Sequence, residues 1–216
     1  MPSIIPTVFA TSKAQFKDRF NKLIKVSNVL QIDFMDGGFV ESKSLPISQI
    51  PNLKKYKNSF EAHLMIYHPE KYIKTLKKKG FKKIIFHYES VKKENIENII
   101  RLIKKADLKA FLAINPETKV SSIIKYLPKV DGILFLGVHP GKEHQSFIPE
   151  VYKKIKQLRK ISNIKIQVDG GVNENSVKKL AKLGAHYVNS GSFISDSPHP
   201  KEAFNKLKTL FIDNKR

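Results

Sequence analysis

Residues 28–40 read NVLQIDFMDGGFV, an apolar segment that runs into two acids, a methionine and two glycines. Apolar side chains alternate with Gln31, Asp33 and Met35 along this segment. Since successive side chains of a strand point to opposite faces, these three share one face. The stretch therefore predicts a strand that brings an amide, an acid and a thioether to one surface close to its end.

Similar apolar runs recur along the chain and alternate with amphipathic stretches. The runs are rich in β-branched and aromatic residues, which is typical of strands. The predicted strands are 3–10, 29–35, 59–66, 82–88, 109–115, 130–138, 164–170 and 186–191. The predicted helices are 12–25, 69–79, 92–105, 117–127, 147–161 and 173–183, and the segment 199–213 closes the chain. Segment 46–57 carries two prolines and is expected to hold at most a short helix.

This alternation predicts a parallel sheet with right-handed crossovers. Eight strand–helix units favour an α/β fold, a single-domain (β/α)8 TIM barrel over residues 1–216. An open doubly wound sheet is the alternative, because eight strands inferred from residue preferences could include a false one. Asn115-Pro116-Glu117 and Asn173-Glu174 are expected to cap two of the helices.

The composition limits the classes of protein that the chain could belong to. It has 216 residues, of which 41% are hydrophobic and none is cysteine. Such a chain can bury one large core and has neither a disulfide framework nor a thiolate metal site. No apolar run is long enough to cross a membrane, and the N-terminus lacks the basic lead of a signal peptide. We therefore expect a cytoplasmic protein.

The formal net charge of +21 admits two interpretations. One is binding to nucleic acid or to another anionic surface. The other is an ordinary enzyme with a lysine-rich surface, which is favoured for two reasons. Arginine, the side chain suited to bidentate phosphate and base recognition, occurs at only four positions. The lysines are spread through the helical stretches, where they would still attract a phosphorylated substrate.

Polar side chains gather where the predicted strands end, which is where TIM barrels carry their chemistry. Asp33 and Asp169 end strands on nearly opposite sides of the predicted barrel. Two such carboxylates could remove a proton from one face of a carbon and return one to the other face. His63 and the two acids could also hold a divalent cation that stabilises an enediolate. Taken singly, each residue also fits a structural role in a turn or in the core.

Glycines follow the last two predicted strands, as Gly170-Gly171 and Gly191-Ser192, and each pair precedes a helix. Glycine lets backbone N–H groups approach an anion closely, and a helix N-terminus attracts negative charge. This is the usual phosphate position in barrels. A pair of tight turns is the alternative for either motif alone, but their occurrence at consecutive strand ends favours phosphate.

Together the motifs resemble the ribulose-phosphate 3-epimerase family over nearly the whole chain. QIDFMDGGFV resembles the family's HxDxMDGxFV signature, and EAHLMIYHPEKYI resembles its HLMxxxPExYI segment. The other matches stand in the family's order: IPTVFA, IFHYES, FLAINPET, VHPGKEHQSFIPEVYKKI and QVDGGVNENSVKKLAKLGAHYVNSGSFI.

The resemblance implies an isomerase of the pentose phosphate pathway. The family interconverts D-ribulose 5-phosphate and D-xylulose 5-phosphate by proton transfer at C3, and Asp33 and Asp169 match its acid and base. It also implies a divalent metal, Zn²⁺, Fe²⁺ or Mn²⁺, held by these two acids, His63 and a second histidine. That histidine is Gln31 here, and an amide oxygen is the weaker ligand. The metal is therefore expected to be weakly held, different or absent, unless His87 points inward and compensates.

The resemblance also identifies the substrate pocket. Thr7 keeps the hydroxyl of the family's serine, and Leu136 replaces a family methionine. The family loop NPGFGGQ reads HPGKEHQ at 139–145, which brings Lys142 and His144 to the rim. The expected substrate-binding residues are Thr7, Met35, His63, Met65, Gly141, Gly170, Gly171, Gly191 and Ser192.

The residues leave two other functions open. A non-catalytic barrel that binds a phosphosugar or RNA would fit the altered residue at 31 and the altered loop. A related phosphosugar lyase or synthase is the other, although both aspartates are retained. For the favoured epimerase, the expected partners are a phosphorylated ketopentose and further copies of the chain in a homo-oligomer.

Overall fold

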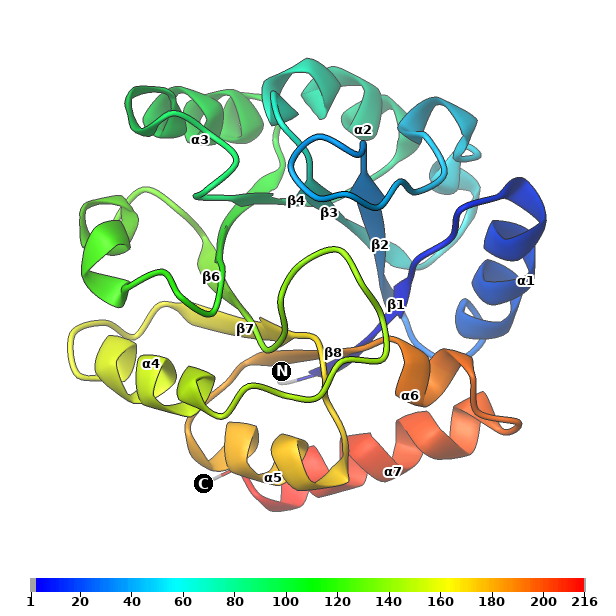
Figure 1. The fold of residues 1–216 in the computed structure, drawn as a ribbon. Helices are drawn as coiled ribbons and strands as arrows, with labels where there is room; N and C mark the ends of the chain where they lie inside the picture. The colour runs from blue at the N-terminus through cyan, green and yellow to red at the C-terminus, as the bar shows by residue number, and fades with distance from the viewer. Residues whose placement is uncertain (1–2, 216) are drawn as a thin grey trace.

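Eight strands form at the segments whose apolar residues predicted them, and they pair in chain order into a closed parallel barrel (Figure 1). The computed structural model describes residues 3–215. The last strand returns to the first, where Ser3 pairs with Tyr187, so the predicted TIM barrel is confirmed. The strands are β1 (Ser3–Val8), β2 (Val29–Met35), β3 (Ser59–Met65), β4 (Lys83–His87), β5 (Lys109–Ile114), β6 (Gly132–Leu136), β7 (Lys165–Asp169) and β8 (Tyr187–Ser190).

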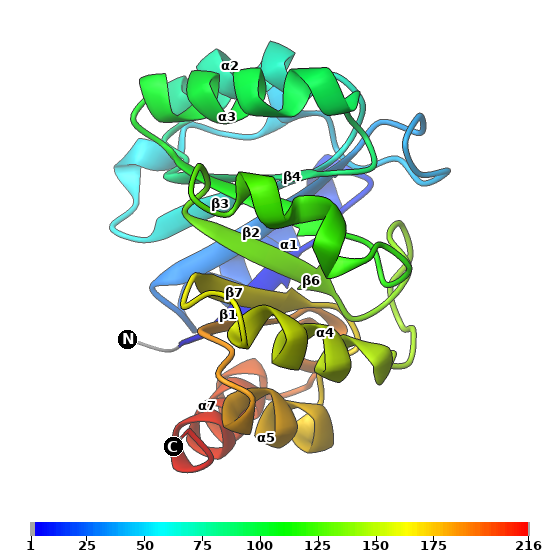
Figure 2. The ribbon, with the colours of Figure 1, turned by 90° about the vertical axis from the view of Figure 1, so that its left-hand side faces the viewer.

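Helices surround the strands and cover the outside of the barrel, as Figure 2 shows from the side. The α-helices are α1 (Lys13–Leu23), α2 (Ile73–Lys79), α3 (Ile96–Lys105), α4 (Glu150–Arg159), α5 (Glu174–Lys182), α6 (Ser192–Ser195) and α7 (Pro200–Asp213). Short 3₁₀ turns complete the connections: η1 (Ile47–Gln49), η2 (Leu53–Lys55), η3 (Pro69–Tyr72), η4 (Lys93–Asn95) and η5 (Val120–Tyr126).

The strands are buried on both faces, which explains their nearly continuous apolar runs. In β4, Ile84 and Phe86 belong to the core between barrel and helices, whereas Ile85 packs inside the barrel with Phe111 and Leu134. Each helix presents one apolar stripe to this shell. In α3 the stripe consists of isoleucines at 96, 99, 100 and 103, the spacing of one helical face.

One predicted helix cap is confirmed and one is wrong. The Asn173 side chain accepts hydrogen bonds from the first turn of α5, with Ser176 completing a capping box. Asn115 starts no helix: its backbone N–H donates to Glu89, its carbonyl accepts from Lys154, and the next helical turn begins only at Val120. The predicted helix at 117–127 is also wrong in type, since this segment forms the 3₁₀ turn η5. Its valine, serines and isoleucines have low α-helix propensity.

Segment 46–57 contains the short turns η1 and η2, as its prolines suggested. Each turn anchors one apolar side chain, Ile47 or Leu53, in the core. Among residues 3–215, none of the helices combines the length and apolar character needed to cross a membrane.

Candidate active site

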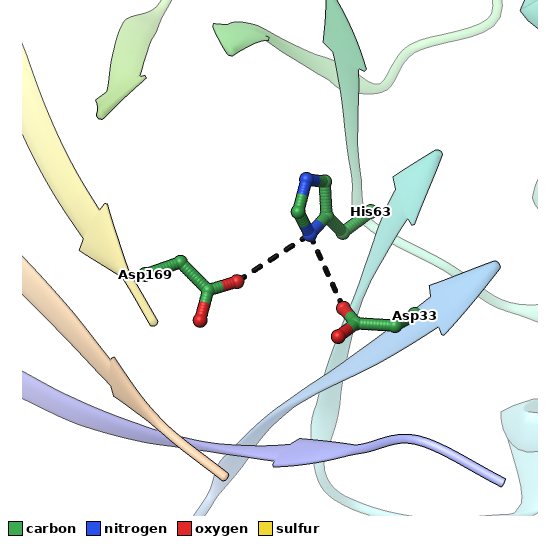
Figure 3. A group of neighbouring side chains, drawn as sticks. All are labelled: Asp33, His63 and Asp169. Atoms are coloured by element: carbon green, nitrogen blue, oxygen red, sulfur yellow. Dashed lines mark hydrogen bonds and ion pairs between the residues drawn. The ribbon is translucent and has the colours of Figure 1, made fainter. Parts of the chain in front are cut away.

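The carboxyl ends of β2, β3 and β7 bring together the three residues predicted to carry the chemistry. Asp33 is the register partner of His63 on the neighbouring strand. His63 Nδ1 lies 3.2 Å from Asp33 Oδ1 and 3.4 Å from Asp169 Oδ2. Figure 3 shows the imidazole between the two carboxylates, which approach it from different sides. The predicted pairing of acids across the barrel mouth is therefore present.

Burial and proximity change the protonation of this group. Burial raises the pKa of Asp33 to about 6, although hydrogen bonding to His63 opposes the shift. Burial also disfavours the imidazolium of His63, but the hydrogen bonds to Asp169 and Asp33 outweigh it and raise its pKa to about 9. In the metal-free protein, an imidazolium at neutral pH therefore supplies the positive charge between the two acids.

The same three side chains fit a divalent cation. One ligand atom from each of Asp33, His63 and Asp169 can be chosen so that all lie within 4.8 Å of one another. Carboxylate oxygens and a neutral imidazole nitrogen are ligands that Zn²⁺, Fe²⁺ and Mn²⁺ accept. A cation would replace the proton on His63 Nδ1, because a histidine ligand must be deprotonated.

Gln31, the altered family position, turns its amide nitrogen toward this group. Its Nε2 lies 2.5 Å from Asp169 Oδ2, 2.9 Å from Asp33 Oδ1 and 3.4 Å from His63 Nδ1. Its Oε1 points away and accepts a hydrogen bond from Gln167. The amide therefore faces the acids as a donor, whereas a metal ligand would have to present the oxygen.

A buried polar layer lies directly below these residues inside the barrel. Three of its members, on β2, β3 and β7, stand two positions before Asp33, His63 and Asp169 on the same strands. The layer consists of Gln31, Glu61, Lys83, Gln167 and Asn189, all at most 8% exposed. Sequence reasoning missed this layer apart from Gln31. The signal was present, because polar residues recur with the two-residue period of inward-facing strand positions.

His87 points into the barrel but stands behind His63. Its Nε2 lies 2.9 Å from His63 Nε2, on the side of that ring away from the acids. Phe39 packs against His87, and Glu89 Oε2 lies 3.5 Å from its Nδ1. Burial lowers the pKa of His87. His87 is thus a neighbour that supports the His63 ring, and it lies outside the Asp33, His63 and Asp169 cluster.

A cavity of about 590 Å³ opens above the cluster and collects the predicted substrate residues. Those that line it are Thr7, Asp33, Met35, His63, Met65, Gly141, Asp169, Gly170, Gly171, Gly191 and Ser192. Met35 and Met65 pack together with Phe9, Phe39 and Val40 as an apolar cluster on one side. Sequence reasoning missed several lining residues, among them Phe9, Glu143, Phe147, Phe193 and Asp196.

The segment between β6 and α4 crosses the barrel mouth, where it is seen in lime green (Figure 1). Lys142 and His144 line the cavity from this loop, as predicted. An ion pair that sequence reasoning missed fixes the loop to α1: Arg19 Nη1 lies 3.0 and 2.9 Å from the two carboxylate oxygens of Glu143. Gly171 permits the close approach of the loop, since its φ is +66° and a Cβ there would lie 2.7 Å from the backbone of Phe147.

Comparisons with known proteins identify one family by sequence and a shared fold by structure. The model of the ribulose-phosphate 3 epimerase family matches residues 1–195. Ribulose-phosphate 3-epimerase of Eremothecium gossypii is 30% identical over 229 residues, covering 100% of this chain and 95% of that protein. The cytoplasmic isoform of ribulose-phosphate 3-epimerase from Oryza sativa subsp. japonica is 28% identical over 211 residues, covering 95% of this chain and 92% of that protein. The crystal structure of 3-hexulose-6-phosphate synthase from Salmonella typhimurium shares the fold, with a TM-score of 0.75 and 15% identity over 99% of this chain and 100% of that chain.

Proposed function

Because the chain belongs to the ribulose-phosphate 3-epimerase family, we propose that it interconverts D-ribulose 5-phosphate and D-xylulose 5-phosphate with Asp33 and Asp169 as its acid–base pair. The observation that supports these roles is the meeting of two carboxylates, from β2 and β7, around His63 at the mouth of the barrel. Both acids line one cavity, so a substrate carbon held between them exposes one face to each.

In this proposal one aspartate removes the proton from C3 and the other delivers a proton to the opposite face. In the metal-free protein burial raises the pKa of Asp33 to about 6, and a carboxyl group with such a pKa can both release and accept a proton near neutral pH. The two residues exchange roles when the reaction runs backward.

Asp33, His63 and Asp169 would hold the divalent cation, for which Zn²⁺, Fe²⁺ and Mn²⁺ are the candidates. When bound, the cation stabilises the negative charge that develops on the substrate oxygens. His63 contributes through Nδ1, and His87 orients its ring from behind by the contact between the two Nε2 atoms.

The remaining cavity residues bind and orient the sugar phosphate. Gly170, Gly171, Gly191 and Ser192 line the side where β7 and β8 end, and we assign the phosphate to their backbone N–H groups. The sulfur atoms and side chains of Met35 and Met65 cover the reacting carbons and exclude water. Thr7 and Gly141 complete the contacts with the substrate.

We further propose that residues 1–216 act as one ribulose-phosphate-binding domain, that copies of the chain form a homo-oligomer and that the protein is cytoplasmic. The name of the rice relative, a cytoplasmic isoform, supports the last point. The non-catalytic phosphosugar- or RNA-binding barrel is not favoured, because the family match is accompanied by an assembled acid pair. The related lyase or synthase is not favoured either, because its likeness to this chain is one of fold.

The test is NMR of D-ribulose 5-phosphate in D₂O with the purified protein, first with chelator and then with each of the three metals. We expect deuterium at C3 together with D-xylulose 5-phosphate. Asp33→Asn should lower turnover by roughly 10²- to 10⁴-fold while the fold remains intact. Asp18→Asn, an exposed acid on α1, is the matched control and should leave turnover unchanged. Substantial epimerisation by Asp33→Asn would refute the assigned role.

A further inference from the structure

Gln31 contacts the same three side chains that would bind the cation of the proposed active site. The amide nitrogen lies within 2.5 to 3.4 Å of Asp169 Oδ2, Asp33 Oδ1 and His63 Nδ1. The same three side chains can converge on a metal, and these are the atoms by which His63 approaches the two carboxylates. The amide group therefore lies where it bridges the acids through two N–H donors, and its positive end faces any cation that enters.

The direction of this amide is determined by its neighbours in the same buried polar layer. Lys83 Nζ can only donate hydrogen bonds, and it lies 3.1 Å from Gln167 Oε1. Gln167 must therefore turn its NH₂ group the other way, where it faces oxygens of Glu61, Asn189 and Gln31 at 3.0, 2.8 and 3.3 Å.

Gln167 donates a hydrogen bond to Gln31 Oε1, so the NH₂ group of Gln31 faces the two acids. If the Gln31 amide turned over, two NH₂ groups would face each other in a site that is 0% exposed at both residues. Lys83 is itself held by Glu61 Oε1 at 2.5 Å, so it cannot easily move away. Buried donors without acceptors are strongly disfavoured, and the network therefore has one favourable arrangement.

We propose that Gln31 is a positioning residue that holds Asp33 and Asp169 together and competes with the divalent cation for them. The orientation that makes it a competitor is imposed by Lys83 through Gln167. The cation then has three protein ligands and has to displace the hydrogen bonds of the amide before it binds. The inference rests on the proposed function for its meaning, but metal binding can be measured without turnover.

The decisive variant is Gln31→Leu. If Gln31 is a ligand, its loss weakens metal binding, whereas if it is a competitor, its loss strengthens metal binding. We expect Co²⁺, a spectroscopic probe for the site, to bind Gln31→Leu at least about tenfold tighter than the parent protein in a chelator competition. This change corresponds to one lost hydrogen bond to a charged group. The visible spectrum of bound Co²⁺ should keep its shape, since the ligands are the same. Gln157→Leu, the same change on the exposed face of α4, should match the parent protein.

Turnover supplies an independent readout of positioning. With saturating metal, Gln31→Leu should lower kcat by roughly 10- to 100-fold with little change in KM, because the acids lose the group that aligns them. If the protein failed the D₂O test above but still bound Co²⁺ more tightly after this substitution, the proposed function would be wrong and the competition would stand.

A measurement on the unmodified protein covers the case in which Gln31→Leu does not fold. The side-chain NH₂ protons of Gln31 should resonate far downfield and exchange slowly in the metal-free protein, and both properties should be lost on addition of Zn²⁺. Weaker Co²⁺ binding by Gln31→Leu, or an NH₂ signal that Zn²⁺ leaves unchanged, would overturn the proposal.

Discussion

Substitution of Lys83 by methionine should destabilise the barrel strongly, although the residue does not line the substrate cavity. Lys83 Nζ and Glu61 Oε1 are 2.5 Å apart, and their side chains are only 10% and 6% exposed. The lysine also lies over the rings of Phe111 and Tyr187, at 4.1 and 4.6 Å from their centroids. Methionine keeps most of the volume but leaves the Glu61 carboxylate without its charge partner in the interior.

Removal of one partner from a buried ion pair lowers the free energy of unfolding by about 3–5 kcal/mol. For a chain of this length, such a change lowers the Tm by roughly 6–20 °C. The measurements are urea unfolding at pH 7 and thermal unfolding followed by circular dichroism. Lys82→Met, at the exposed neighbouring position, is the matched control and should stay within about 0.5 kcal/mol of the parent protein.

The double variant Lys83→Met with Glu61→Leu separates charge from packing. Replacement of both partners by apolar side chains is often neutral or stabilising, so it should restore most of the stability that the single change removes. A single variant as stable as the parent protein would refute the reasoning about the buried charge. A double variant as unstable as the single one would show that packing, and not the carboxylate, accounts for the loss.

Three further predictions follow from other parts of the structure. In the metal-free protein the pKa of His63 is raised to about 9, so its stabilising contribution is complete below about pH 6.5 and disappears as the pH rises through about 9; urea unfolding with chelator should show this loss in the parent protein but not in His63→Asn. Arg19→Met should release Glu143 and the β6–α4 loop, which hydrogen exchange should detect as faster exchange at residues 139–148, with a higher KM; unchanged exchange there would contradict the tethering. Gly132→Ala should lower stability by roughly 1–3 kcal/mol, because the added Cβ would lie 2.3 Å from the Phe111 ring; thermal unfolding measures this, and a Tm equal to that of the parent protein would contradict it.

The fold and the three central site residues could be predicted because both depend on short-range periodicity. Strand alternation placed Asp33 and His63 on inward faces, and the barrel topology brought the ends of distant strands to one rim. The segment 117–127 could not be assigned in the same way. Its apolar spacing suits either kind of helical turn, and the low α-helix propensity of its valine, serines and isoleucines has to be weighed against that spacing.

Other features of the site depend on pairs of residues that lie far apart in the chain. Arg19 and Glu143 are separated by 124 positions, and neither has a local pattern that indicates the other. The sequence showed that Gln31 replaces a family histidine, but not which end of its amide faces the acids. That direction depends on Lys83 and Gln167, which belong to other strands. The closed barrel brings these residues into one network with Gln31.

The closure of the barrel by β1 and β8 also affects how the chain folds during synthesis. The backbone of β1 pairs with β2 on one side, but its other partner, β8, leaves the ribosome roughly 180 residues later. Synthesis adds about 5–20 residues per second, so this edge of β1 stays unpaired for on the order of 10–40 seconds. Such an edge can pair with other chains, so newly made protein depends on the rapid arrival of the segment that begins at Tyr187 or on a chaperone that covers the edge. A truncation before Tyr187 would leave that edge permanently open, and we expect it to aggregate.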